Sequence, residues 1–176
     1  MEPYDVPKGD TSLYGFHSGA PGPEAYARAL EEVNDALKSG ALLRGGPGAG
    51  KSDLALRFLA LAGDGELRPI LVADDQVFVE TNGKGQLLAS PPETIAGKIE
   101  IRGLGIVAVP FLPQAELVLI CDLVNDQDVP RMPPEPWERT EIAGRLVPAL
   151  KLAPFELSAP LKLKMALLLA APDNPN

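Results

Sequence analysis

The sequence is poor in cysteine, histidine and aromatic residues, and it has no long hydrophobic run. Its only cysteine, Cys121, excludes an internal disulfide, and no N-terminal segment joins basic residues to an apolar run, so secretion is not indicated. The longest apolar run, MALLLAA near the C-terminus, is far shorter than the roughly 20 residues that a membrane span requires. We therefore expect a cytoplasmic protein that does not enter a membrane.

Positive charge is also scarce. The 16 Lys and Arg residues are outnumbered by 24 Asp and Glu residues, which gives a formal net charge of -8, and the basic residues form no cluster. Because nucleic-acid backbones are held mainly by clustered Lys and Arg, we expect no nucleic-acid partner. The 176 residues, 45% of them hydrophobic and without an internal repeat, suit one α/β domain of ordinary size.

The first 23 residues differ in composition from the rest of the chain. They are rich in Gly, Pro and polar residues without a lasting periodicity, so residues 1–23 are expected to form an extended arm or a disordered tail outside the core. Residues 24–176 are expected to form the folded domain. Its first element is a predicted helix from Pro23 to Gly40, because apolar residues recur there at helical spacing: Tyr26, Leu30, Val33 and Leu37.

The later pattern alternates strands and helices around glycine turns. A short apolar run at 41–43 leads into a glycine-rich loop, and a helix is predicted over 52–62. Next come a predicted hairpin around TNGKG, a strand pair that turns at Gly103 and Gly105, and a strand at 115–124 that is apolar on both faces. An irregular strand pair at 139–152 and a helix at 158–171 close the domain.

The glycine-rich loop matches a phosphate-binding motif without a mismatch. The motif is G-x-x-x-x-G-K-[ST], and the residues expected to bind a nucleotide are Gly45, Gly46, Pro47, Gly48, Ala49, Gly50, Lys51, Ser52 and Asp53. The glycines let successive N–H groups point at phosphates, the lysine reaches the terminal phosphates, and the serine hydroxyl can ligate Mg²⁺. A glycine turn in a non-binding domain is the alternative, and the position between a predicted strand and helix disfavours it.

Two pairs of charged residues follow the loop. Asp74 and Asp75 lie at the end of an apolar strand, where a parallel sheet has its ligand-binding sites. Since neighbouring strand residues point to opposite faces, only one of them is expected to face the loop and to accept a proton from a hydroxyl; two solvated turn residues are an equal alternative. Glu100 and Arg102 share one face of a strand and can supply a metal ligand and a charge clamp, or form a surface ion pair.

Three segments, GGPGAGKSDLALR, LVADDQV and IEIRGLGIV, resemble the catalytic domain of the HPr kinase/phosphorylase family in its short form. The resemblance covers residues 41–124 well and, more loosely, PRMP and LAPFELSAPLKLKMAL. It implies a P-loop NTPase-type α/β domain related to phosphoenolpyruvate carboxykinases, with a mixed sheet and flanking helices. It also implies a homo-oligomer, typically a hexamer, that uses ATP and Mg²⁺ to phosphorylate a serine of the phosphocarrier HPr and removes the phosphate by phosphorolysis.

The resemblance also implies roles for individual residues. Lys51 would hold the β and γ phosphates, and Ser52 and Glu100 would ligate the metal. Asp75 would be the base for the substrate serine and the acid in the reverse direction.

Three further residues belong to the same expected catalytic set. Asp74 and Arg102 come from the matching segments, and Arg131 in PRMP matches an arginine that the family uses in both directions. Asp122 ends an apolar strand, as a Walker B aspartate does, but the family takes its metal carboxylate from the position of Glu100. Asp122 is therefore expected to be secondary.

One catalytic position departs from the family. A family histidine precedes the loop, and ungapped counting places Leu30 there. The only histidine, His17, lies upstream in the expected arm, where a solvated tail residue is the simplest interpretation. Two alternatives to an HPr kinase therefore stay open: a nucleotide-binding regulatory module with reduced or no catalysis, and a P-loop kinase with another acceptor.

Overall fold

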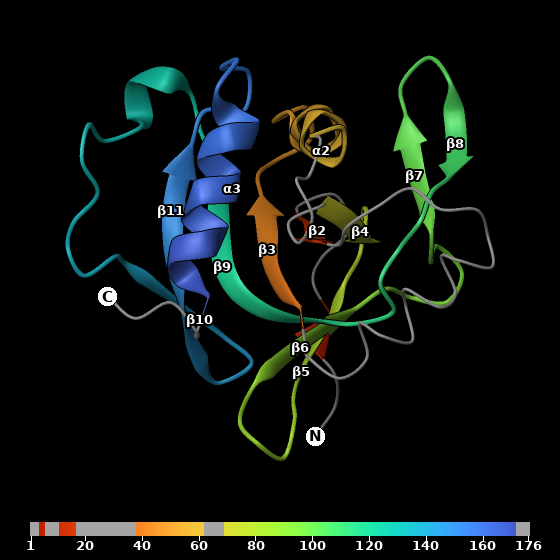
Figure 1. Cartoon of the computed structure of the whole chain (residues 1–176), viewed down its shortest axis with the longest axis horizontal. Coiled ribbons are helices and arrows are strands. Elements are labelled where there is room, and N and C mark those ends of the chain that lie inside the picture. Colours follow the sequence, from red (N-terminus) through yellow and green to blue (C-terminus); the bar gives the residue numbers. More distant parts are fainter. Residues whose placement is uncertain (1–3, 6–10, 17–37, 62–68, 172–176) are drawn as a thin grey trace.

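The computed structural model describes residues 4–5, 11–16, 38–61 and 69–171, which form an α/β fold around one curled, mixed sheet (Figure 1). Its strands are β1 (Tyr4–Asp5), β2 (Thr11–Phe16), β3 (Ser39–Arg44), β4 (Pro69–Ala73), β5 (Phe78–Thr81), β6 (Leu87–Ser90), β9 (Ala115–Leu123), β10 (Arg139–Ile142) and β11 (Arg145–Leu152). A separate hairpin is made by β7 (Lys98–Ile101) and β8 (Gly105–Ala108). The helices are α2 (Lys51–Leu59), the 3-10 turn η1 (Asp126–Asp128) and α3 (Ala159–Ala170).

The centre of the sheet sets the position of the site. β3 pairs in parallel with β9, and β9 pairs in parallel with β11. On the other side of β3, β2 is antiparallel to both β3 and β4, so β4 runs in the same direction as β3. The carboxyl ends of β4, β3, β9 and β11 therefore meet at one edge, where open α/β sheets bind ligands.

Two apolar clusters cover the two faces of this sheet. Leu43 and Cys121 belong to the cluster that packs under α2 and α3, whereas Leu42 and Ile120, their strand neighbours, belong to the cluster on the opposite face. In Figure 1, α3 lies over β9 and β11 and α2 lies beside it. The strand predicted at 115–124 is confirmed as a central strand that is buried on both faces. Its apolar side chains contribute to both clusters.

The expectation for the N-terminal segment was wrong in part. Thr11–Phe16 do not lie outside the core sheet: they form β2, which pairs with β3 and β4. This strand satisfies backbone groups on both neighbours that would otherwise lack partners. Residues 17–37, with the greater part of the helix expected from Pro23, lie outside the described residues. Gly40 does not stop a helix, because it lies within β3, where it pairs with Leu117 of β9.

The other predicted elements are confirmed with small changes in their ends. The helix expected over 52–62 spans Lys51–Leu59, and the closing helix spans Ala159–Ala170. The β5–β6 hairpin turns at Asn82, whose carbonyl accepts from the Gly85 amide at 2.9 Å. No helix among the described residues is long and apolar enough to cross a membrane.

Cys121 has the structural role expected of a buried cysteine. It is buried within β9, and this burial raises the pKa of its thiol to about 12, with a further contribution from the charge of Asp122. A protonated, inaccessible thiol is not a nucleophile. Cys121 is therefore a core residue.

Candidate active site

The phosphate-binding loop joins the end of β3 to the start of α2. Gly48 and Gly50 have φ values of 78° and 86°, in the left-handed region that favours glycine. A Cβ at Gly50 would also lie 2.9 Å from a ring carbon of Phe155, so only glycine fits there. No side chain caps α2 at Gly50, and the first N–H groups of a helix have no intrahelical acceptor. The helix therefore begins with amides that suit an anion.

Lys51 is held inside the loop. Its side chain is buried, and Nζ donates to the backbone oxygens of Gly45 at 2.6 Å and Gly46 at 3.1 Å. The first two glycines of the motif thus position the lysine through their carbonyl groups. The ammonium lies where the terminal phosphates of a nucleotide would meet the loop.

A cleft of about 580 Å³ brings most of the predicted residues together. Its lining comes from four separate parts of the chain: Pro47, Gly48, Ala49, Gly50, Lys51, Ser52, Asp53, Asp74, Asp75, Glu100, Arg102 and Phe155. The loop, the aspartate pair and the first strand of the β7–β8 hairpin thus surround one space. Phe155 carries no signal in the sequence that predicts a place in this site.

The two aspartates differ in burial. Asp74 is 4% exposed, and its Oδ2 accepts a hydrogen bond from the Glu100 amide at 3.0 Å, whereas Asp75 is exposed. The expectation that only one of them faces the loop was wrong, because both line the cleft. β4 ends at Ala73, so the two residues lie in a bend, where the alternation of strand side chains no longer applies.

The environment of Asp74 favours its neutral form. Burial raises its pKa above the ordinary value of 3.8, and the charges of Asp75 and Glu100 raise it further, against the lowering effects of the Glu100 amide and of Lys51. Its second oxygen, Oδ1, is buried without a hydrogen-bond partner among the described residues. A buried oxygen of this kind suits a proton or a ligand in the cleft.

The raised pKa of Asp74 predicts a pH dependence of stability. The folded protein holds this proton more tightly than the unfolded chain, so Asp74 contributes stability that is fully present below 3.8 and is lost as the pH rises through the raised pKa. Asp74→Asn cannot titrate. We expect the free energy of unfolding of the variant, relative to the parent, to increase from about pH 3.5 to about pH 7, as measured by urea unfolding. A difference that is constant over this range would contradict the prediction.

Glu100 and Arg102 reach the cleft from the β7–β8 hairpin. Ile99 is fully buried in the cluster under α2, so its strand neighbour Glu100 points the other way and is exposed. Arg102 follows β7 in the turn and is exposed too. Both side chains line the same cleft, which supports the predicted shared face.

The oxygen donors in the cleft fit Mg²⁺. Ser52 and Glu100, the predicted ligands, both line it, and the buried Oδ1 of Asp74 is nearby in the same lining. The described residues contain no cluster of three or more His, Cys, Asp or Glu that could hold a metal ion by themselves. Mg²⁺ is commonly bound through one or two protein oxygens together with substrate phosphates, so this sparse set suits it.

Arg131 is not brought to the cleft. It is exposed in the proline-rich segment between η1 and β10, and it is not one of the lining residues. Its expected role in catalysis stays a prediction that the geometry of this chain does not support.

Asp122 is engaged in an ion pair. Its Oδ1 accepts from Nε of Arg44 at 2.7 Å, and its Oδ2 accepts from Nη2 of the same guanidinium at 2.8 Å. This two-point pair occupies both carboxylate oxygens and links the ends of β3 and β9. Asp122 is thus a structural residue, which agrees with its expected secondary place.

Asp122→Asn separates the structural role from a metal-binding one. Because the pair is half-exposed, with 30% and 34% of the two side chains accessible, we expect the variant to lose only about 1 kcal/mol in free energy of unfolding. The substitution should leave the Mg²⁺-dependent affinity for nucleotide unchanged, as measured by calorimetry. A large loss of Mg²⁺ dependence would instead identify Asp122 as a metal ligand.

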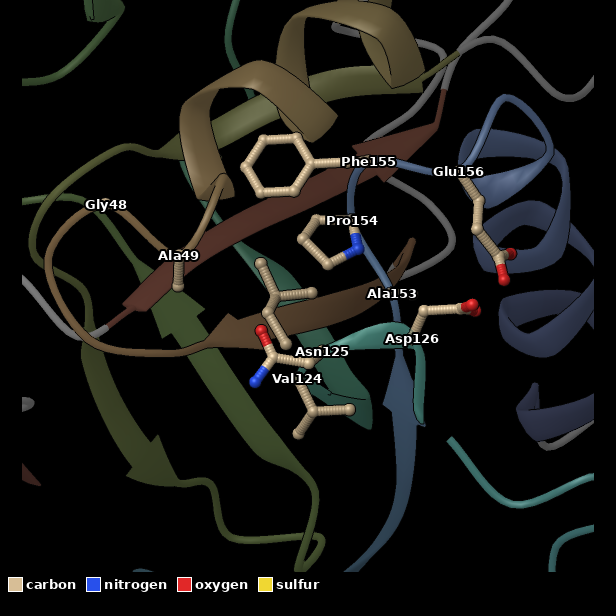
Figure 2. A pocket seen from close by; sticks show the side chains of 10 residues that line it. Gly48, Ala49, Val124, Asn125, Asp126, Ala153, Pro154, Phe155 and Glu156 are labelled. Atoms are coloured by element: carbon tan, nitrogen blue, oxygen red, sulfur yellow. The ribbon is translucent and has the colours of Figure 1, made fainter. Parts of the chain in front are cut away.

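A second cleft of about 490 Å³ adjoins the first and was not anticipated from the sequence (Figure 2). It is lined by Gly48, Ala49, Leu123, Val124, Asn125, Asp126, Ala153, Pro154, Phe155 and Glu156. The segment LAPFELS is part of the resemblance, but no local pattern in it indicates a cavity. The wall forms only when the ends of β9 and β11 come together.

Comparisons with known proteins agree with this geometry. The family model described as HPr Serine kinase C-terminal domain matches residues 31–125, which include the loop, both aspartates and the β7–β8 hairpin. A solved structure of the HPr(Ser) kinase/phosphatase from Coxiella burnetii is similar, with a TM-score of 0.64 and 22% sequence identity. The match covers 90% of this chain and 88% of that one. It confirms the α/β fold with a mixed sheet and flanking helices.

Proposed function

The chain belongs to the family of the HPr serine kinase C-terminal domain, and we propose that it is an ATP-dependent kinase that phosphorylates a serine of an HPr-type phosphocarrier. We also propose that it removes this phosphate by phosphorolysis: inorganic phosphate attacks the phosphoserine phosphorus, the bond from that phosphorus to the serine oxygen breaks, and pyrophosphate and the free serine hydroxyl are formed. The proposal rests on one observation: the phosphate-binding loop, Asp75, Glu100 and Arg102 all line the same cleft.

The phosphoryl donor binds through the loop in this proposal. The amides at the start of α2 surround the β and γ phosphates, and Lys51 and Arg102 offset the charge on the transferred group. Mg²⁺, held by Ser52 and Glu100, would neutralise further phosphate charge when bound. These residues act by positioning and electrostatics, which is what phosphoryl transfer mainly requires.

Asp75 is the proposed general base. The serine oxygen attacks the γ phosphorus, the bond from that phosphorus to the β–γ bridging oxygen breaks, ADP leaves, and the hydroxyl proton passes to Asp75. Asp75 is exposed at the cleft and can meet a side chain of another protein, whereas Asp74 is buried and hydrogen-bonded to the hairpin. Asp74 is thus the positioning residue for Glu100.

The acceptor is tested by direct transfer. γ-Labelled ATP and Mg²⁺ are incubated with the full chain and purified HPr, or with HPr whose target serine is replaced by alanine. We expect label on intact HPr alone. Label on neither, together with clear ATP binding, would favour the regulatory module that the missing family histidine suggests. Label on other proteins would favour a kinase with another acceptor.

We also propose that the chain assembles as a homo-oligomer, a hexamer by family resemblance. Several large apolar side chains are exposed on the described part of the chain, among them Leu104, Ile106, Leu161 and Met165. Apolar exposure of this kind is common at surfaces that contact other proteins. Light scattering after size exclusion gives the subunit count, and a monomer at all concentrations would overturn this proposal.

A further inference from the structure

We infer that Arg57 is a positioning residue for the phosphate-binding loop, and that it acts by fastening residues 154–156 against the loop. The inference rests on the proposed function and deepens it, because it names a residue outside the cleft that sets how tightly the cleft holds the phosphates of the donor. Arg57 does not line the cleft, so its effect on phosphate binding must reach the loop through other residues.

The guanidinium of Arg57 bridges α2 to the segment between β11 and α3. Nη1 donates to the backbone oxygen of Glu156 at 3.2 Å, and Nη2 donates to the backbone oxygen of Pro154. Nε and Nη2 also donate to Oδ2 of Asp53, at 3.0 Å and 2.6 Å. Because Asp53 lies one turn earlier on the same helix, this pair fixes the direction in which the guanidinium points. The planar fork of an arginine makes these contacts together, whereas the ammonium of a lysine is a point charge without that geometry.

The fastened residues 154–156 form a wall of the phosphate-binding loop. Phe155 lines the cleft, and a Cβ at Gly50 would lie 2.9 Å from its ring and 3.1 Å from the Cβ of Pro154. Figure 2 shows the rings of Phe155 and Pro154 close to one another at the start of α2. Gly50 directly precedes Lys51, the first residue of α2, so the two rings rest on the residue where the loop becomes the helix.

Contact with the loop on one side does not by itself hold this wall. Phe155 is 70% exposed and Leu157 is 98% exposed, so this part of the segment gains little from apolar burial. The two backbone oxygens that accept from Arg57 belong to Pro154 and Glu156, the residues immediately before and after Phe155. Arg57 therefore fixes the backbone on both sides of the ring that contacts Gly50.

A fixed wall matters because a glycine-rich loop has many accessible conformations. Gly48 and Gly50 have positive φ values, which glycine adopts freely but which the chain must keep for the loop amides to converge on an anion. Ordering the loop at the moment of binding costs affinity, whereas a loop that is already ordered avoids this cost. By holding Phe155 and Pro154 against Gly50, Arg57 keeps the loop in its anion-binding shape before the donor arrives.

The test measures the affinity for inorganic tripolyphosphate with Mg²⁺ by calorimetry on the full chain, because this ligand meets the loop without a nucleoside. We expect Arg57→Gln and Arg57→Lys each to weaken binding by roughly 5- to 30-fold, the effect of losing one or two hydrogen bonds that order a site. Since Arg57→Lys keeps the charge, a loss in this variant separates the fork from a long-range attraction for phosphate.

Arg139→Gln is the matched control, because Arg139 is exposed in β10 and lines neither cleft. Its affinity should stay within about twofold of the parent, as is usual for surface substitutions. Thermal unfolding of every variant sets a temperature at which all of them are folded.

A double substitution tests whether Arg57 acts through the wall. Phe155→Ala removes the ring from Gly50 and should itself weaken tripolyphosphate binding. If Arg57 acts through that ring, Arg57→Gln should add less than about twofold in the Phe155→Ala background, because substitutions on one route are not additive.

The outcomes separate this inference from the proposed function. An unchanged tripolyphosphate affinity in Arg57→Gln, or an affinity that Arg57→Lys retains, would overturn the positioning role and leave the phosphate site intact. Fully additive losses in the double variant would overturn it too, because Arg57 would then act by another route. If the parent binds neither tripolyphosphate nor ATP, the proposed kinase fails, and the positioning role fails with it.

Discussion

Asp75→Asn is expected to reduce phosphoryl transfer to HPr by about 10²- to 10⁴-fold, the usual contribution of a positioned general base. The amide has nearly the shape of the carboxylate but cannot accept the serine proton. Because Asp75 is exposed at the cleft, its replacement should leave the fold and Mg²⁺-ATP binding essentially unchanged. The rate is measured with labelled ATP, and the affinity is measured separately by calorimetry.

Asp128→Asn is the matched control for this experiment. Asp128 is an exposed carboxylate of η1 that lines neither cleft, so its loss changes the net charge equally without touching the site. A transfer rate of Asp75→Asn equal to that of Asp128→Asn would show that another group takes the proton. A parallel loss of ATP affinity would show that Asp75 acts in donor binding instead.

Lys51→Ala is expected to reduce both ATP binding and phosphoryl transfer, and its effect on transfer should be similar in size to that of Asp75→Asn. The ammonium is the one loop cation held beside the backbone oxygens of Gly45 and Gly46 in the described cleft. Its removal takes away the positive charge that contacts the terminal phosphates. Loss of a preorganised electrostatic group of this kind typically lowers turnover by about 10²- to 10³-fold. ATP affinity should fall as well, because the lysine holds phosphates before the reaction and during it.

The control for Lys51→Ala is Lys164→Ala, on α3 and outside both clefts. Thermal unfolding of both variants checks the fold. We expect Lys164→Ala to retain the parent's ATP affinity and transfer rate. Unchanged ATP affinity in Lys51→Ala would contradict the assignment of the loop as the phosphate site.

The phosphate-binding loop and its flanking elements could be predicted because their signals are local. Glycines at the left-handed positions 48 and 50, a lysine and a serine must be close in sequence to curl one loop around one anion. The alternation around Glu100 likewise predicted the face that the β7–β8 hairpin turns to the cleft. Periodicity also found the closing helix, whose buried residues are Ala159, Pro160, Leu163 and Leu167.

Long-range pairing explains what the sequence could not predict. Composition marked residues 1–23 as an arm, but β2 finds its partners in β3 and β4, strands that lie far apart in the chain. Asp122 ends an apolar strand, as a metal-binding Walker B aspartate does. In the structure its carboxylate instead pairs with Arg44, which is 78 residues away in the chain. Such pairings depend on register across the sheet, which no local pattern contains.

By itself, the sequence determined the family, the loop and the three segments, around Asp74, Glu100 and Arg131, that were expected to carry charged groups to it. The tertiary structure alone decided which of those groups share a cleft, that Asp74 is buried while Asp75 is exposed, and that Arg131 lies elsewhere. It also created the second cleft, since Val124 and Phe155 become neighbours only because β9 and β11 pair in parallel. Residue types and spacings specify local chemistry, whereas the packing of distant strands sets burial and proximity, on which the roles of these residues depend.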